Sequence, residues 1–204
     1  ARRAGRVSVQ SSQMKRAVAY WGVPEERIVV IPNGFDAPSR IPDKRSTREA
    51  LGMRGSVAVS AARLVPWKGF VGLIEAVREV IKRVSDFHLY IIGDGPEEER
   101  LRRMVAERGL AERVLFTGRL DKADLMRYLA AADVFVLNTE YEGLSNQILE
   151  VYAMGTPVVT TDIPGNRDIL EHMVTGCLIP LRDRGVLVHA VARVLMDAAL
   201  AERL

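Results

Sequence analysis

The stretch VFVLNTEYEGLSNQILEVYAMGTPVVTT, from Val134 to Thr161, decides the fold that we predict for this chain. It consists of an apolar run (Val134–Leu137), a polar loop, a segment with helical spacing that ends at Gly155, and a second apolar run (Val158–Thr161). This order is typical of two parallel strands joined by a crossover helix. Because both runs are apolar throughout, we expect a sheet that is buried on both faces.

The same alternation extends over most of the chain. Three segments, beginning near Phe70, Leu125 and Leu187, repeat apolar residues at three- and four-residue intervals, the spacing of one helix face. We therefore predict an α/β fold, a Rossmann-like parallel sheet with helices on both faces. The remaining runs with strand character are Arg27–Ile31, Ser56–Ala61, Phe87–Ile92, Val114–Thr117 and, more weakly, Cys177–Ile179.

The first residues do not follow this alternation. Ser12 is expected to cap a helix that runs to Tyr20. Residues 38–45 contain two prolines and mixed charges, which predicts a surface connection. The chain opens without methionine and closes inside a helical pattern, so both ends are expected to be cuts in a longer protein. We interpret residues 1–36 as the tail of a missing N-terminal domain with a linker, and residues 37–204 as the ligand-binding domain.

Composition excludes several classes of protein. The chain has 204 residues, of which 48% are hydrophobic and 27% charged, as in ordinary globular proteins. The net charge of +3 is small and mixed in sign, and it argues neither for nor against a nucleic-acid surface. No nucleic-acid partner is expected. One cysteine, Cys177, excludes an intrachain disulfide and favours a cytoplasmic setting. No apolar run approaches the roughly 20 residues that cross a bilayer, and peripheral attachment to the inner membrane face stays open for the full-length protein.

Loops that follow the predicted strands carry the unusual residues, and parallel sheets bind ligands at the carboxyl ends of their strands. In the loop from Arg63 to Gly69, Arg63 and Lys68 flank a proline turn just before a predicted helix. An arginine fork, an ammonium group and free helical N–H groups together suit a diphosphate. Two solvated surface cations remain the alternative.

Two further loops carry weaker signals. Gly93–Glu97 lacks a dinucleotide fingerprint, because Glu98 occupies the position of its third glycine. We expect a tight turn at the lip of a ligand cleft, with Pro96 at the first helical position. The turn around Arg119 offers backbone groups to a base.

The most specific loop contains Glu142 and Glu150, with seven residues between them. A helix capped by Ser145 or Asn146 would place Glu142 ahead of its first turn and Glu150 inside it. Each carboxylate accepts two hydrogen bonds from a vicinal diol, so the pair could hold sugar hydroxyls at two points. Two surface glutamates are the alternative, although Glu150 has apolar neighbours.

These stretches, in this order, resemble the C-terminal domain of GT-B retaining glycosyltransferases of family four (glycosyl transferases group one). The resemblance runs from about residue 25 to 198. It is carried by IPNGFD (Ile31–Asp36), ARLVPWKG (Ala62–Gly69), IIGDGPE (Ile91–Glu97), FTGRL (Phe116–Leu120), the stretch Ala131–Asp162 and GCLIP (Gly176–Pro180).

The resemblance implies roles for individual residues. Arg63 and Lys68 match the pair that neutralises the donor diphosphate, and Glu142 matches the first glutamate of the family's E-x7-E motif, near the transferred sugar. These three residues are the expected catalytic set. Glu150 matches the second glutamate, which binds the ribose hydroxyls. The other expected donor-binding residues are Gly93, Asp94, Arg119, Leu120, Gly143, Leu144 and Asn146.

The implied activity is transfer of a hexose from a nucleotide-diphosphate sugar to an acceptor hydroxyl, with retention of the anomeric configuration. The acceptor, a glycan, lipid or small molecule, would bind through the missing N-terminal domain, so the isolated chain is expected to be inactive. No metal and no cofactor are expected, because the chain contains no D-x-D pair and its three histidines, His88, His172 and His189, have no metal-ligand spacing.

Two other functions fit the same architecture, and one motif differs from the family's pattern. A non-catalytic nucleotide-binding module or a GT-B-type sugar-nucleotide epimerase would share this architecture. Where many members of the family have two glycines and then a glutamate, this chain has Gly165-Asn166-Arg167-Asp168, which leaves the acidic position at Asp168 uncertain. Neither the sugar nor the base can be derived from these residues.

Overall fold

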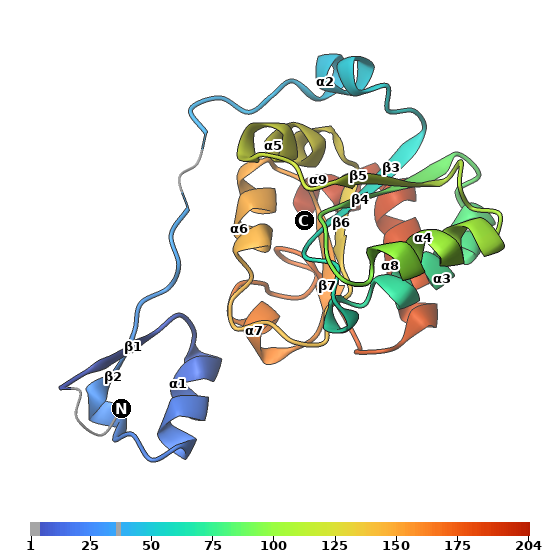
Figure 1. The fold of residues 1–204 in the computed structure, drawn as a ribbon. Helices are drawn as coiled ribbons and strands as arrows, with labels where there is room; N and C mark the ends of the chain where they lie inside the picture. The colour runs from blue at the N-terminus through green and yellow to red at the C-terminus, as the bar shows by residue number, and fades with distance from the viewer. Residues whose placement is uncertain (1–4, 36–37) are drawn as a thin grey trace.

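The computed structural model describes residues 5–35 and 38–204. Its centre is a six-stranded sheet in the order β5-β4-β3-β6-β7-β8, and every pairing between these strands is parallel (Figure 1). The Rossmann-like fold class predicted from the sequence is confirmed. The strands are β3 (Ser56–Ala61), β4 (Phe87–Ile92), β5 (Val114–Gly118), β6 (Val134–Leu137), β7 (Val158–Thr161) and β8 (Cys177–Ile179).

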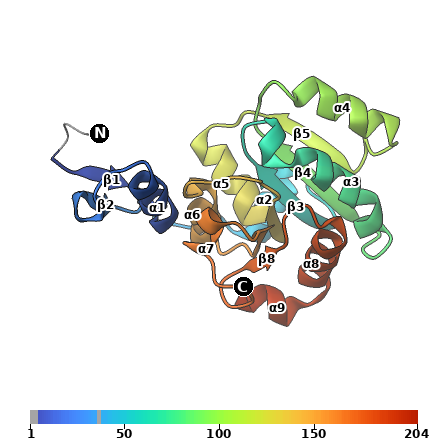
Figure 2. The same cartoon turned by 90° about the horizontal axis from the view of Figure 1, so that it is seen from below.

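Helices cover both faces of this sheet (Figure 2). Along β6, Val134 and Val136 pack into one hydrophobic core and Phe135 and Leu137 into the other, and all four are at most 1% exposed. A strand whose alternate side chains pack into two cores needs apolar residues on both faces, which explains the unbroken apolar runs. One core includes α3 (Phe70–Ile81), α4 (Glu98–Glu107), α8 (Arg184–Met196) and α9 (Ala198–Arg203), and the other includes α2 (Lys44–Leu51), α5 (Lys122–Ala131) and α6 (Asn146–Ala153).

The strand order positions the site. The chain enters the sheet at β3, proceeds outward through β4 and β5, and then returns to β6 on the other side of β3. The connections from β3 and β6 therefore leave towards opposite faces of the sheet. A crevice opens at such a switch point, at the carboxyl ends of the two central strands, and ligands bind there in open α/β sheets.

Residues 7–30 lie outside the six-stranded sheet (Figure 1). They form β1 (Val7–Val9), α1 (Ser12–Tyr20), a short 3-10 turn and β2 (Ile28–Val30), and β1 pairs with β2 in parallel. The predicted strand at 27–31 is therefore present, but it belongs to this separate two-stranded sheet. The boundary placed at residues 36 and 37, and with it Asp36 of the IPNGFD stretch, lies outside the described residues.

Helix boundaries differ from the predictions at three places. Ser11, not Ser12, caps α1, because its hydroxyl accepts the Met14 N–H at 3.2 Å. Pro96 lies two residues ahead of α4, which begins at Glu98. Of the surface connection predicted at 38–45, residues 38–43 are not helical, but Lys44 and Arg45 already belong to α2.

An ion-pair cluster at Asp133 explains the third difference. This residue precedes β6, and its carboxylate accepts hydrogen bonds from the Arg48 guanidinium at 2.9 and 3.1 Å and from the Val57 N–H at 2.8 Å. It also pairs with the Lys44 ammonium at 2.8 Å. These charged groups hold α2 against the sheet. The helix therefore has no apolar periodicity from which it could be predicted. None of the helices in the described ranges combines the length and apolar character needed to span a lipid bilayer.

Replacing Gly69 with alanine should lower the free energy of unfolding by about 2–5 kcal/mol. Gly69 has a φ of +68°, and a Cβ there would overlap the Asn138 carbonyl, so left-handed strain and steric overlap add. Gly52, with a φ of +65° and no described atom within 4 Å of such a Cβ, is the matched control and should lose about 1–2 kcal/mol. Urea denaturation measures both, and equal losses would contradict the close approach at Gly69.

Candidate functional site

The loops that follow β3 and β6 are hydrogen-bonded to each other at the switch point. The Glu140 N–H donates to the Trp67 carbonyl at 2.7 Å, and the Thr139 hydroxyl donates to the same carbonyl at 3.2 Å. The Asn138 side chain donates to the Gly69 carbonyl at 3.0 Å. The β3 loop ends in a 3-10 turn, Pro66–Lys68, that leads directly into α3. Its position is therefore set by the β6 loop.

Lys68 and Glu142 meet across this junction. The Lys68 ammonium lies 2.5 Å from Oε1 of Glu142, and the two side chains are only 19% and 11% exposed. A largely buried ion pair has to compensate the loss of water around both charges, so each group strongly requires a partner. The structure thus brings one predicted cation and the first predicted glutamate into direct contact.

Arg63 lies on the other side of the same loop, in a pocket of about 590 Å³. The Leu64 N–H donates to the Asp94 carbonyl at 2.7 Å, and the Gly93 N–H donates to the Gly118 carbonyl at 2.9 Å. These bonds join the ends of three neighbouring strands, β3, β4 and β5. The residues that line the pocket include Arg63, Gly93, Asp94, Arg119 and Leu120, so the structure brings together five of the predicted residues.

Glycine is required at two positions beneath this pocket. Gly93 has a φ of +131°, and a Cβ there would overlap the Ala62 carbonyl. Gly95 has a φ of +155°, and a Cβ there would overlap the Leu64 carbonyl. The Gly93–Glu97 loop is therefore a tight turn at the edge of a pocket, and close backbone approach explains its glycines.

Gln147 joins the pocket to Glu150 and was missed in the sequence. Its side chain lines the pocket, and its amide donates to Oε2 of Glu150 at 2.9 Å. Burial raises the pKa of the Glu150 carboxyl, against the opposing effects of the Lys122 ammonium and of the Gln147 hydrogen bond. The i, i+3 spacing of Gln147 and Glu150 on one helix face was the available signal.

The remaining predicted residues, Gly143, Leu144 and Asn146, lie where α6 begins. They are near the N-terminal unit, the part of the chain that contains β1, α1 and β2. A Cβ on Gly143 would lie 3.3 Å from Sδ of Met14, so α1 packs against this loop. Asn146 is exposed, and its Oδ1 accepts a hydrogen bond from Nδ2 of Asn33 at 2.6 Å. Leu144 is half-buried. These residues lie beside Glu142, outside the pocket that contains Arg63.

The departure at Gly165–Asp168 has a structural explanation. The short helix α7 (Pro164–Arg167) packs so closely on the Glu142 loop that a Cβ on Gly165 would overlap the Glu142 carbonyl. Asp168 faces the N-terminal unit, where its carboxylate accepts the Gln13 N–H at 3.2 Å. Gly165 thus allows α7 to pack closely against the Glu142 loop, and the Asp168 side chain contacts α1.

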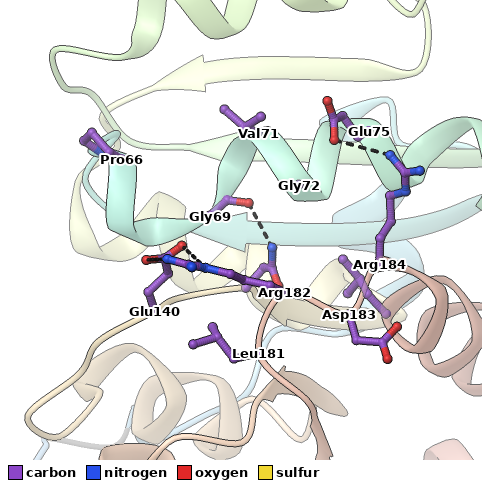
Figure 3. A pocket seen from close by; sticks show the side chains of 12 residues that line it. Pro66, Gly69, Val71, Gly72, Glu75, Glu140, Leu181, Arg182, Asp183 and Arg184 are labelled. Carbon is purple, nitrogen blue, oxygen red and sulfur yellow. Dashed lines mark hydrogen bonds and ion pairs between the residues drawn. The ribbon is translucent and has the colours of Figure 1, made fainter.

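A second cavity, of about 520 Å³, borders the first turn of α3 (Figure 3). Arg182 pairs across it with Glu140 through two hydrogen bonds of 3.1 and 2.9 Å, and Arg184 lies 3.4 Å from Glu75. Among the described residues that line this cavity, none belongs to the predicted site. We therefore take the Arg63 pocket and the Lys68–Glu142 pair as the candidate site. Within the described ranges, no group of three or more His, Cys, Asp or Glu side chains is arranged to hold a metal ion.

The sequence model of a family described as "Glycosyl transferases group 1" matches residues 43–204. The chain belongs to the glycosyl transferases group 1 family. The resemblance derived from the ordered motifs is thereby confirmed, and the fold corresponds to the C-terminal Rossmann-like half of a GT-B glycosyltransferase.

Several known proteins are similar to most of this chain. Lipopolysaccharide core biosynthesis glycosyltransferase LpsD of Rhizobium meliloti is 37% identical over 148 residues, 72% of this chain and 41% of that protein. A GDP-mannose-dependent phosphatidylinositol monomannoside mannosyltransferase of Mycobacterium tuberculosis is 32% identical over 201 residues, 93% and 52% respectively. The crystal structure of Anabaena HepE in complex with UDP and glucose has a TM-score of 0.87 at 26% identity and matches 98% of this chain and 56% of HepE. The chain spans about half the length of the curated relatives it matches.

Replacing Glu150 with glutamine should stabilise the fold at neutral pH. Because burial raises its pKa above the ordinary 4.5, the folded state binds this proton more tightly than the unfolded chain does. The charge therefore destabilises the fold at every pH above the raised pKa, and this penalty disappears as the pH falls below about 4.5. Urea denaturation should show a gain for E150Q at about pH 7 and none at about pH 4. The same gain at both pH values would contradict a cost of the charge.

Proposed function

We propose that this chain is the donor-binding half of a metal-independent, retaining glycosyltransferase that moves a hexose from a nucleotide-diphosphate sugar to an acceptor hydroxyl. One observation carries the proposal: Lys68 and Glu142, from loops on opposite sides of the topological switch point, lie 2.5 Å apart. A cation for the diphosphate and a carboxylate for the sugar are needed at adjacent positions of one donor, and this pair provides both.

The chemistry follows from the charges that develop during transfer. As the bond to the sugar breaks, negative charge grows on the leaving phosphate and positive charge on the sugar ring. Lys68 and Arg63, together with the first N–H groups of α3, are suited to stabilise the phosphate charge. The ammonium group has three donors, so Lys68 can keep its bond to Glu142 while it donates to a phosphate oxygen. Glu142 then accepts hydrogen bonds from the sugar. We propose that the acceptor hydroxyl attacks the sugar from the same side of the ring on which the phosphate leaves, and that the leaving phosphate assists this attack.

The Arg63 pocket suits the nucleoside. Arg119, Leu120 and the adjoining backbone groups would contact the base, and Glu150, held by Gln147, would accept the ribose hydroxyls. Gly143, Leu144 and Asn146 would approach the sugar and phosphates. HepE was solved with UDP and glucose in a similar fold, which supports a nucleotide-sugar donor for this chain.

The acceptor belongs to another part of the protein in this proposal. We propose that residues 1–36 are the end of a preceding domain and its linker, and that residues 37–204 form the donor domain. The contacts of α1 with Gly143 and Asp168 then lie where the two halves of the enzyme meet. The isolated chain should bind a nucleotide without turnover, and calorimetry with uridine, guanosine and adenosine diphosphate sugars would identify the base.

Lys68→Ala and Glu142→Ala should each reduce kcat of the full-length protein by about 10²–10³-fold, because each removes a preorganised charge. Lys82 and Glu79 form a matched control, since they pair at 2.7 Å at the C-terminal end of α3, where both side chains are exposed. Lys82→Ala should leave transfer unchanged. Product analysis by NMR should find a new glycosidic bond with retained configuration. Release of an epimerised nucleotide sugar would instead favour the epimerase, and unchanged transfer by both site variants would refute the assignment.

Sugar transfer should continue at the same rate in excess EDTA. The leaving diphosphate is neutralised by Arg63, Lys68 and a helix N-terminus in this proposal, so no divalent cation has to bridge its oxygens. Initial rates with and without the chelator test this. A loss of more than about tenfold that added Mg²⁺ or Mn²⁺ restores would contradict metal independence.

A further inference from the structure

Four polar side chains lie fully buried beneath the loop that carries Glu142. Thr139, Thr160, Thr161 and Asn166 are each 0% exposed. They come from the β6 loop, from the last two residues of β7 and from α7. Buried polar groups destabilise a core unless they are hydrogen-bonded, so the partners of these four side chains indicate what the cluster does.

The cluster begins at Asn166. Its Nδ2 donates to the Thr160 hydroxyl and to the Thr161 carbonyl, both at 2.9 Å. The Thr160 hydroxyl in turn donates to the carbonyl of Leu137, the last residue of β6, at 2.7 Å. The side-chain amide therefore fixes the end of β7 relative to the end of β6.

From Thr161 the bonds continue into the site. Its hydroxyl donates to the Thr139 carbonyl at 2.5 Å. The Thr139 hydroxyl is shared between the carbonyls of Trp67, at 3.2 Å, and Tyr141, at 3.1 Å. Trp67 immediately precedes Lys68, and Tyr141 immediately precedes Glu142. The buried bonds thus end on the two residues that flank the ion pair.

Apolar packing alone does not account for this arrangement. Oδ1 of Asn166 is buried, and no donor in the described part of the chain reaches it. An apolar side chain of similar shape would remove the donor that the Thr161 carbonyl and the Thr160 hydroxyl share, so the hydrogen bonds of Asn166, and not its packing, account for the residue. The hydroxyls also bond to carbonyls at strand ends and in loops, where the ladder of the sheet no longer provides partners.

We infer that Asn166, Thr161 and Thr139 form a relay of positioning residues that holds Glu142 against Lys68. The inference rests on the proposed transferase function, because it assigns the relay to the catalytic pair of that function. Displacing a catalytic group by about 1 Å costs up to about 10²-fold in rate. Hydrogen bonds that set the position of the loop carrying Glu142 can therefore change the rate of transfer.

Thr161→Val tests the relay because valine keeps the shape and removes the hydroxyl. In the full-length protein kcat should fall by about 10- to 100-fold, with KM for the donor changed much less. Thr161→Ser, which retains the hydroxyl, should restore most of the rate. The control is Thr156→Val, which also removes a buried hydroxyl, one that donates to the Leu129 carbonyl at 2.7 Å, away from the site. Equal kcat for the Thr161→Val and Thr156→Val proteins would overturn the inference.

Hydrogen exchange provides a readout that does not depend on activity. In the 204-residue chain, Thr161→Val should accelerate exchange of the Glu140 amide, which bonds to the Trp67 carbonyl, about tenfold more than Thr156→Val does. The Leu89 amide of β4 should respond equally to both substitutions, as a report of global stability. Unchanged exchange at Glu140 would overturn the relay even if the wild-type protein transfers sugar. Accelerated exchange together with a wild-type protein that transfers no sugar would instead overturn the proposed function and, with it, the catalytic role of the relay.

Discussion

The junction between the β3 and β6 loops is the constraint on which the rest of the site depends. Parallel topology sends these two connections to opposite faces of the sheet, so they would diverge if nothing held them together. The Glu140 N–H and the Asn138 side chain hold them with hydrogen bonds to carbonyls of the β3 loop. Lys68 and Glu142 then meet as a consequence of backbone bonding. A charge pair positioned in this way does not have to rely on its own attraction, which the loss of water largely offsets.

Several features of this site reduce stability. The Glu150 charge is disfavoured by burial, and Asn166 leaves a buried acceptor without a donor among the described residues. Gly69 and Gly93 adopt left-handed conformations against neighbouring carbonyls, which only glycine tolerates. The two apolar cores on either side of the sheet compensate these costs. Unfavourable groups that converge on one end of a well-packed sheet are characteristic of a functional site.

Much of this architecture was predictable because apolar runs report directly on burial. The strands at 56–61, 87–92, 134–137 and 158–161 have the predicted ends, since both of their faces lie in hydrophobic cores. The contact of Lys68 with Glu142 followed in outline from topology, because both residues come after central strands. Helix α2 was missed because charges at Asp133 hold it on the sheet. Gln147 was missed because its only signal, the i, i+3 spacing to Glu150, also occurs on exposed helix faces. The buried threonines could not be recognised, since threonine side chains are more often exposed than buried.

The shorter of the two central strands, β6, has a consequence for how this sequence can vary. β6 is held at one end by the Asp133 carboxylate and at the other by the bonds of Asn138 and Thr139. Between these anchors each residue also has an assigned core, so one inserted residue would exchange the contents of the two cores and displace the loop beyond. The anchors at its two ends therefore fix the number of residues in β6. Changes in chain length can therefore accumulate in the outer loops, whereas this segment tolerates changes of residue type alone.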